Sequence, residues 1–416
     1  MSSSHHDDSS RGPRKRLPTG LPNRLPKRLP QVLRSRKDLE DNGVSFLAAS
    51  AVPPGTLPIT ADGVTFNMAQ EVTWVDDSTF AVGRWDGTFS LFRFNDSPTA
   101  GPLVTASAST PATEGVQMIV WLGAGTFATS NDGTSIVLWS TGDGTWRDLR
   151  ESAQVSFDSS LGVANSGDVV DSDEGRHLVV GHANGFASVW LWSLSSSRLE
   201  LRRTIDLRSE KPTNPWGIHN IRGVASVAPT VARANVITGS EDGSLCLVDI
   251  LSGAIRSRTV YNPAAERGIN GIALLGSKLL VANCAVGPSD SNIWSFDVDG
   301  GAAVIAPRDR ARLVVDPAAP QVFNFCTVWG KYSGGACYFS STEEGALWMG
   351  TVDASGKLST IGYMRVTSPL GAALAYNGNG RLVLAAYDLH EFRTGASVGT
   401  DAPNDGQTAD SQSRKP

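Results

Sequence analysis

The sequence predicts an all-β protein, and three observations support that prediction. Glycine is abundant, with 43 residues, and there are 11 tryptophans, whereas windows with helical periodicity are scarce. Short apolar segments alternate with clusters of Gly, Asp, Asn and Ser, which is typical of strands joined by tight turns. A strand–turn–strand motif also recurs along most of the 416 residues. Such recurrence predicts a β-propeller, in which four-stranded sheets are arranged around a ring.

The repeated motif consists of an apolar strand, a tight turn and a second apolar strand. Asp-Gly, Asn-Gly and Glu-Gly supply the positive φ angles that two-residue turns need. Successive turn residues are 46, 52, 58, 49, 53 and 45 positions apart, slightly above the ~40–45 residues of a typical blade. The copies occupy residues 80–94, 127–140, 178–194, 236–250, 279–298, 338–352 and 382–395. Their turn residues are Gly87, Gly133, Gly185, Gly243, Asn292, Gly345 and His390.

Other segments complete the predicted blades. Apolar segments before the motif are expected to form the innermost strands, and more polar segments after it the outer strands. The last copy lacks an outer strand, and we expect a segment within residues 44–68 to supply it and close the ring. The prediction is a seven-bladed β-propeller over residues 44–398, with disordered tails at residues 1–43 and 399–416. Expected innermost strands are 71–75, 116–122, 221–227 and 268–275, and expected outer strands are 198–207 and 255–261.

These copies resemble WD repeats. In that family the turn Asp is followed six residues later by a Trp-Asp pair that ends the third strand. The resemblance covers about four-fifths of the chain and implies a scaffold that binds peptides, proteins or nucleic-acid complexes on its rims. The family's His before the first strand is largely absent, so the resemblance implies an incomplete Asp–His–Ser–Trp hydrogen-bond network. Val248-Asp249 and Phe296-Asp297 stand at the pair, and Trp190 and Trp139 stand at its Trp.

The N-terminal segment differs in composition from the rest of the chain. Leu-Pro recurs every four residues between Leu17 and Pro30, which favours an extended or disordered conformation. Residues 11–37 hold ten Lys or Arg and no acid, whereas residues 38–416 carry a net charge of −13. Such an arm either binds the phosphates of nucleic acid or of an anionic membrane, presents a linear motif to another protein, or is a solvated tail. The candidate anion-binding residues are Arg14, Lys15, Arg16, Arg24, Lys27, Arg28, Arg34, Arg36 and Lys37.

Two turns and one long insert carry side chains suited to a protein interface. Aromatic and Arg side chains on a rim are frequent hot spots of binding energy. The alternative is that each of these side chains packs beneath its own loop. The insert, residues 208–220, is expected to join two blades on one rim. The candidates are Arg84, Trp85 and Asp86 in the first turn, Trp216 and His219 in the insert, and Tyr387 and His390 in the last turn.

Enzyme and metal signatures are weak. The GxSxG match at residues 395–399 has no later His to act as a base, and the glycine-rich segment at residues 122–128 runs into a strand instead of a helix. The His residues occur singly, without metal-ligand spacing. The expected inner strands are apolar, which argues against a catalytic site in a central channel. The cysteines Cys246, Cys284, Cys326 and Cys337 are scattered and are interpreted as apolar strand residues.

The sequence therefore predicts a non-enzymatic scaffold for protein–protein interactions, with no cofactor and with its partners on the rim. One alternative is a nucleic-acid-associated protein tethered by the basic arm, and a second is a propeller hydrolase or lyase. No apolar run of about 18 residues is present, and no secretory signal is recognised, so the expected compartment is the cytoplasm, or the nucleus in a eukaryote.

Overall fold

A computed structural model of the chain describes residues 44–50, 59–61, 64–66, 69–84, 86–93, 103–109, 115–130, 133–141, 147–230, 233–265, 267–332, 335–365, 373–385 and 389–394. Among these residues the structure is almost entirely antiparallel β-sheet, with one short 3₁₀ helix, η1 (Ser159–Leu161). The all-β class is confirmed. Both predicted tails, and with them the whole basic arm, lie outside the described residues.

Five four-stranded sheets are separate from one another. The first contains β4 (Ala69–Trp74), β5 (Thr79–Arg84), β6 (Thr88–Arg93) and β7 (Leu103–Ser109). The second contains β8 (Ile119–Gly123), β9 (Thr126–Ser130), β10 (Ser135–Ser140) and β11 (Arg150–Ser156). The third contains β12 (Ala164–Ser172), β13 (Gly175–His182), β14 (Phe186–Ser193) and β15 (Arg198–Asp206). The fourth contains β16 (Ile221–Thr230), β17 (Arg233–Ser240), β18 (Ser244–Asp249) and β19 (Ile255–Val260). The fifth contains β28 (Ala373–Tyr376), β29 (Arg381–Ala385), β30 (Leu389–Thr394) and β1 (Val44–Ser50).

A sixth, eight-stranded sheet departs from the prediction of separate four-stranded blades. It contains β20 (Ile269–Leu275), β21 (Lys278–Val286), β22 (Ile293–Asp299) and β23 (Val304–Ala311), followed by β24 (Gln321–Tyr332), β25 (Gly335–Thr342), β26 (Ala346–Val352) and β27 (Leu358–Arg365). The two runs of four strands are joined because β21 and β24 are long enough to pair with each other. Cys284, Ala285 and Val286 lie opposite Phe323, Val322 and Gln321.

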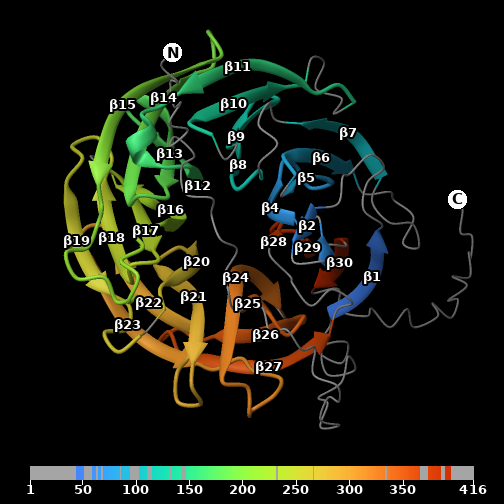
Figure 1. Cartoon of the computed structure of the whole chain (residues 1–416), viewed down its shortest axis with the longest axis vertical. Coiled ribbons are helices and arrows are strands. Elements are labelled where there is room, and N and C mark those ends of the chain that lie inside the picture. The colour runs from blue at the N-terminus through green and yellow to red at the C-terminus, as the bar shows by residue number, and fades with distance from the viewer. Residues whose placement is uncertain are drawn as a thin grey trace, which may run out of the picture. The chain divides into compact units, whose positions relative to one another are not determined.

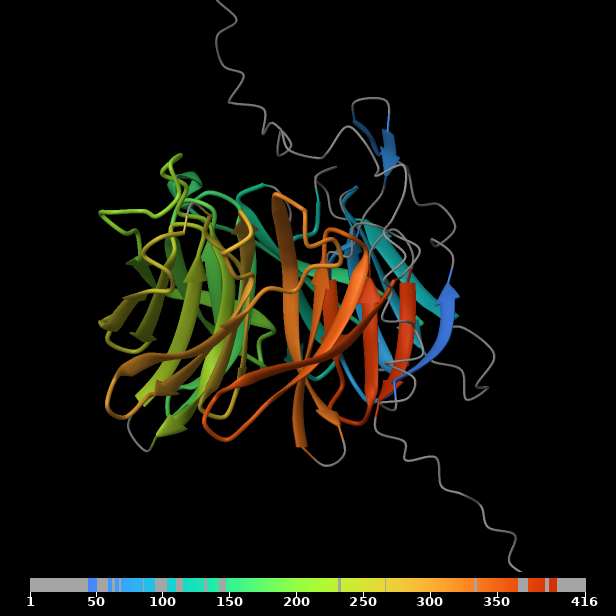
Figure 2. The same cartoon turned by 90° about the horizontal axis from the view of Figure 1, so that it is seen from below.

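The sheets follow one another in chain order around a ring (Figures 1 and 2). The ring closes as predicted, because β1, from the segment upstream of the first sheet, pairs antiparallel with β30 near the end of the propeller. A small additional hairpin, β2 (Ile59–Ala61) with β3 (Val64–Phe66), lies between β1 and β4 in the sequence. All seven predicted strand–turn–strand motifs are strand pairs in the structure, from β5–β6 to β29–β30.

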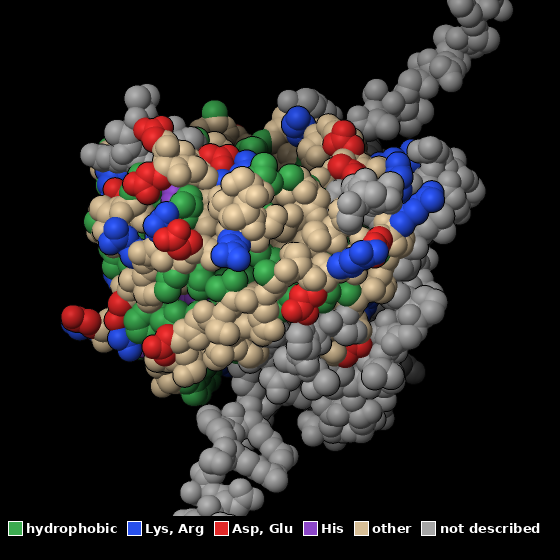
Figure 3. Space-filling model, turned by 90° about the horizontal axis from the view of Figure 1, so that it is seen from above, with side chains coloured by type: hydrophobic (Ala, Val, Ile, Leu, Met, Phe, Trp, Pro, Cys, Tyr) green, Lys and Arg blue, Asp and Glu red, His purple; other side chains and the backbone are tan. Residues whose placement is uncertain are grey.

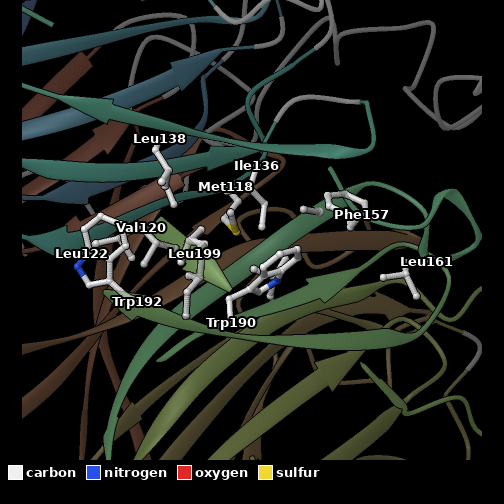
Figure 4. Close-up of a cluster of buried hydrophobic side chains, with 14 residues drawn as sticks. Met118, Val120, Leu122, Ile136, Leu138, Phe157, Leu161, Trp190, Trp192 and Leu199 are labelled. Atoms are coloured by element: carbon white, nitrogen blue, oxygen red, sulfur yellow. The ribbon is translucent and has the colours of Figure 1, made fainter. Parts of the chain in front are cut away.

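The hydrophobic core consists of clusters between neighbouring sheets. In one of them, Trp190 and Trp192 of β14 face Met118, on the approach to β8, and Leu138 of β10 (Figure 4). Another cluster joins residues of β4–β6 to residues of β28–β30, so the first and last sheets also bury apolar side chains against each other. Each sheet has apolar residues on both faces, and burial of those faces requires a neighbour on either side. Three of the four cysteines, Cys246, Cys284 and Cys337, are buried in strands, as the sequence predicted.

Arginines on the outer strands link neighbouring sheets. Arg203 Nη2 of β15 donates a 2.6 Å hydrogen bond to the carbonyl of Leu251, in the turn that follows β18. In the same way Arg256 of β19 donates to the carbonyls of Gly300 and Gly301, in the turn that follows β22. These hydrogen bonds satisfy turn carbonyls of the next sheet and hold its outer edge in place.

Candidate functional site

The long insert predicted as a rim feature connects β15 to β16, and we define residues 207–220 as the rim loop. It packs on two turns, the β13–β14 turn and the β17–β18 turn. Gly185 and Gly243 of those turns have φ angles of 82° and 87°, which favour glycine. A Cβ at Gly185 would lie 2.5 Å from Arg208 Cγ, and one at Gly243 would lie 2.3 Å from Thr213 Oγ1. The two glycines therefore provide both the turn geometry and the space that the rim loop occupies.

Asp242, in the β17–β18 turn, holds both ends of the rim loop. Its side chain is fully buried, and Oδ2 accepts a 2.9 Å hydrogen bond from Ser209 N–H and lies 2.9 Å from His219 Nδ1. Its Oδ1 accepts hydrogen bonds from the N–H and the hydroxyl of Ser244, at 2.9 and 2.5 Å. The backbone N–H of Thr213 donates to the Asp242 carbonyl at 2.9 Å. A buried carboxylate with four donors is well satisfied, so this arrangement fixes the loop to the turn.

Asn214 organises the centre of the rim loop. Its side chain is 4% exposed, and Nδ2 donates to the carbonyls of Glu241 and Ile218 at 2.7 and 2.8 Å. Its Oδ1 accepts from the backbone N–H groups of Trp216 and Ile218 at 3.1 and 3.0 Å. Because Asn214 satisfies these backbone groups from inside, the side chains between them are free to point outward.

Two large apolar side chains of the rim loop are exposed to solvent. Trp216 is 58% exposed and Ile218 is 41% exposed. The guanidinium of Arg267, from the loop between β19 and β20, lies over the Trp216 ring at 4.3 Å from its centroid. Arg267 Nη2 donates to Gln321 Oε1 at 3.3 Å, and its buried Nε has no acceptor among the described residues. We refer to Trp216, Ile218 and Arg267 as the rim surface.

Trp216 differs from the tryptophans of the repeated motif. Trp139, Trp190 and Trp348 are buried, and each donates its indole N–H to a hydroxyl, of Thr129, Ser188 and Thr342 respectively. Those three side chains are part of the packing between sheets, with their polar atom satisfied. Trp216 does not pack in the core between sheets, and its exposure results from its position in the rim loop.

Charges of both signs surround the rim surface. Glu241 in the β17–β18 turn forms an ion pair with Arg222 of β16. Burial raises the pKa of Glu343, in the β25–β26 turn, to about 7, although its Oε1 accepts a 3.0 Å hydrogen bond from Phe323 N–H. The charges of Glu343 and Arg267 both act on the Cys284 thiol, so the two lie in one neighbourhood. Interspersed acidic and basic side chains are also seen on the face of the molecule in Figure 3.

The other predicted rim residues have structural positions. Arg84 is 1% exposed, its guanidinium lies 5.9 Å from the Phe92 ring centroid, and desolvation lowers its pKa to about 10 despite attraction to Asp86. Asp86 Oδ1 accepts hydrogen bonds from the N–H and hydroxyl of Thr88 at 3.0 and 2.6 Å. His390 is 1% exposed. The expectation that Arg84 and His390 are exposed contacts is wrong, because both are strand residues, of β5 and β30, that are buried in the sheet packing.

Three further expectations have different outcomes. His219 lies at the rim as predicted, but its Nδ1 contacts Asp242, and its side chain is only 22% exposed. Trp85 and Tyr387 lie outside the described residues, as do the arm candidates. In the β16–β19 sheet the hydrogen-bond network lacks a different member from the one expected: His219, before the first strand, is connected to Asp242 and Ser240, but Val248 occupies the Trp position.

Sequence analysis missed Ile218 and Arg267 as surface residues and Asn214 and Asp242 as their support. One signal was available. Loops that precede β16 and β20 emerge on the same rim of the predicted propeller, which places the Trp of one loop near the Arg of the other. Their contact could have been inferred from the predicted topology alone.

A second surface feature lies at the opposite end of β16. It is an open groove of about 570 Å³, lined by residues that include Val227, Gly276, Asp297 and Val304. Among the described residues no group of three or more His, Cys, Asp or Glu is placed to hold a metal ion. The described residues also contain no helix that is long and apolar enough to cross a membrane.

The ring of antiparallel sheets, with glycine turns such as those at Gly185 and Gly243 between second and third strands, is a β-propeller. Solved structures share this fold. The β-propeller domain of Cps50 (Swd1) from Myceliophteria thermophila has a TM-score of 0.57 at 12% identity, over 83% of this chain and 100% of that chain. The WD40 β-propeller domain of Doa1 also has a TM-score of 0.57 at 12% identity, over 85% of this chain and 98% of that chain.

The sequence comparisons are negative: no protein-family model matches the chain, and no curated protein matches it. At 12% identity the structural likeness shows the fold alone. Because 1607 solved chains match this fold, it does not single out a function.

Proposed function

We propose that this protein is a non-enzymatic scaffold that binds other proteins through the rim surface. The observation that carries the proposal is the exposure of Trp216 and Ile218 on a loop whose backbone is held by Asn214 and Asp242. Exposed apolar side chains on a mobile loop would lose conformational entropy on binding, whereas a fixed loop has already lost it. Trp and Arg are the residues most often found at the energetic centre of protein interfaces.

The chemistry of the inner strands supports a structural role over catalysis. Contrary to the sequence-based expectation of apolar inner strands, β4 carries Glu71 and β12 carries Asp168. Asp168 Oδ2 accepts a 2.7 Å hydrogen bond from Ser226 N–H of β16, and Oδ1 accepts one of 2.8 Å from Val169 N–H. Both oxygens therefore have a donor, and the Oδ2 bond connects β12 to the neighbouring sheet. Burial also raises the pKa of the Cys246 thiol to about 11, which leaves it protonated and unreactive.

We further propose that the ring has seven blades, with the eight-stranded sheet counted as two. Support comes from the buried side chains, because one core cluster joins β16–β19 to β20–β23, the next joins β20–β23 to β24–β27, and a third joins β24–β27 to β28–β30. The two halves of the eight-stranded sheet thus pack face to face, as separate blades do. The extra pairing of β21 with β24 involves three residue pairs and leaves this packing intact.

A second proposal concerns the arm. Ten cations without an acid between residues 11 and 37 favour a polyanion as an additional partner. If the arm binds nucleic acid, affinity in a gel-shift assay falls steeply with salt and is lost when residues 1–40 are deleted. Retention of binding in the deletion variant would contradict this second proposal and leave the first untouched.

The scaffold proposal is tested by affinity purification from the native cell, with nuclease treatment in all samples. We expect specific proteins to be recovered with the full chain and lost with Trp216→Ala. Leu194→Ala is the matched control, because Leu194 is also a large exposed apolar residue, at 61%, but lies in the turn after β14. Recovery of the same proteins with Trp216→Ala as with the unchanged protein would contradict the rim surface as the binding site.

A further inference from the structure

Among the described residues, Arg267 forms no ion pair with a carboxylate. Its side chain donates a 3.3 Å hydrogen bond to the neutral amide of Gln321 and also interacts with the Cys284 thiol. Most other arginines near a rim or an outer strand have an acidic partner or donate to a backbone carbonyl at 3.0 Å or less. The ion pairs join Arg176 to Asp171, Arg208 to Asp206, Arg222 to Glu241 and Arg308 to Asp297.

The environment of Arg267 makes this difference chemically meaningful. The Arg267 guanidinium lies over the Trp216 ring, and the N–H donors of a guanidinium lie around the edge of its plane. Contact with the Trp216 ring restricts the Arg267 side chain, so less conformational entropy is lost when an acceptor binds. A carboxylate is the acceptor that matches a guanidinium in shape and charge.

We propose, as a deepening of the proposed function, that the rim surface binds a segment of a partner protein in which an apolar side chain stands next to a single carboxylate. The apolar side chain packs on Trp216 and Ile218, and the carboxylate accepts hydrogen bonds from Arg267. Sequence flanking this pair is neutral or basic, because Glu241 and Glu343 lie on the same rim and residues 38–416 carry a net charge of −13. The same negative charge disfavours nucleic acid at this surface.

The proposal is tested with synthetic twelve-residue peptides bound to the full chain. The first set has a central pair of an apolar residue and Glu, with Lys in the flanking sequence. In two matched sets Gln or Lys replaces the Glu, and in a third Ser replaces the apolar residue. Fluorescence anisotropy is expected to show binding of apolar–Glu members, weakened about tenfold or more by the Glu-to-Gln change. With Arg267→Gln, the Glu and Gln members should bind equally. Arg202→Gln is the matched control, because Arg202 on β15 is exposed and paired with Glu200, and it should change nothing.

The outcomes separate this inference from the proposed function. Equal binding of Glu and Gln members to the unchanged protein, or a Glu preference that survives Arg267→Gln, overturns the carboxylate site. Failure of every set to bind also overturns it. If partner recovery from cells still depends on Trp216, the scaffold proposal stands without this inference. A shift from dimer to monomer on Trp216→Ala in size-exclusion chromatography would overturn the inference in favour of a second copy of the chain as the occupant.

Discussion

The rim of the β16–β19 sheet and the rim of the β4–β7 sheet both carry residues suited to binding, but Trp216 of the first is exposed whereas Arg84 of the second is buried. At the first, Trp216 is 58% exposed while the buried Asp242 has four hydrogen-bond donors. At the second, Arg84 is 1% exposed, and its Nε and Nη1 have no acceptor in the part of the chain that the structure describes. Residue type alone therefore does not decide whether a side chain at a rim is exposed to solvent. A long loop with its own polar side chains can support an apolar residue in solvent, whereas a short turn leaves its flanking residues inside the sheet packing.

The largest expected effect is that of Asp242→Ala. The substitution leaves the Ser209 and Ser244 N–H groups without their acceptor and releases His219, so the free energy of unfolding should fall by about 3 kcal/mol. Hydrogen exchange should also increase at residues 209–219, because the rim loop loses its attachment. Chemical denaturation and exchange mass spectrometry measure the two effects.

Asp299→Ala is the matched control for this prediction. Asp299 also accepts hydrogen bonds from backbone N–H groups, of Gly301 and Ala302, both at 2.8 Å, but it lies in an exposed turn. Water can replace it there, so the expected loss is below about 1 kcal/mol. Equal losses for the two variants would break the comparison, because the rim loop would then be no more dependent on its polar support than an ordinary turn.

An intermediate effect is expected for Glu71→Gln, in the same sheet as Arg84. Burial raises the pKa of Glu71 from 4.5 to about 8, with a smaller opposing contribution from the Val72 N–H. Between these values the folded protein retains a proton that the unfolded chain has lost, so the free energy of unfolding decreases as pH rises from about 5 to 8. The decrease attributable to Glu71 is on the order of 2 kcal/mol, allowing for its partial exposure. Glu71→Gln cannot ionise and should flatten this part of the stability–pH profile.

Thermal melts between pH 5 and 9 measure this dependence, with Glu200→Gln as the control for an exposed carboxylate of β15. The same slope in Glu71→Gln as in the unchanged protein would show that the charge of Glu71 is accommodated. The contrast between a sheet with unpaired buried charges and one with satisfied charges would then be lost.

Sequence patterns were sufficient to predict a β-propeller because each blade repeats the same pattern of apolar strands and tight turns. Apolar alternation and turn glycines such as Gly243 predicted the strand pairs, and the missing outer strand of the last copy predicted the pairing of β1 with β30. The pairing of β21 with β24 was not foreseen, because it depends on strand length beyond the repeated motif. The exposure of side chains at the rims was predicted for Trp216 but not for Arg84. Trp216 and Arg84 both stood near turns, but the exposure of Trp216 depends on a loop held in part by Asp242, which is distant in sequence.

The smallest expected effect belongs to Arg84→Met, and its sign distinguishes the two rims. Methionine has a similar length, fits beside Phe92, and leaves no desolvated donors, so the free energy of unfolding should stay constant or rise by about 1 kcal/mol. Partner recovery should be unchanged, because a side chain that is 1% exposed does not contact a partner. Chemical denaturation and affinity purification test both statements. A loss of stability of several kcal/mol would mean that the guanidinium has a strong acceptor after all, and that the β4–β7 rim is organised around a satisfied charge as the β16–β19 rim is.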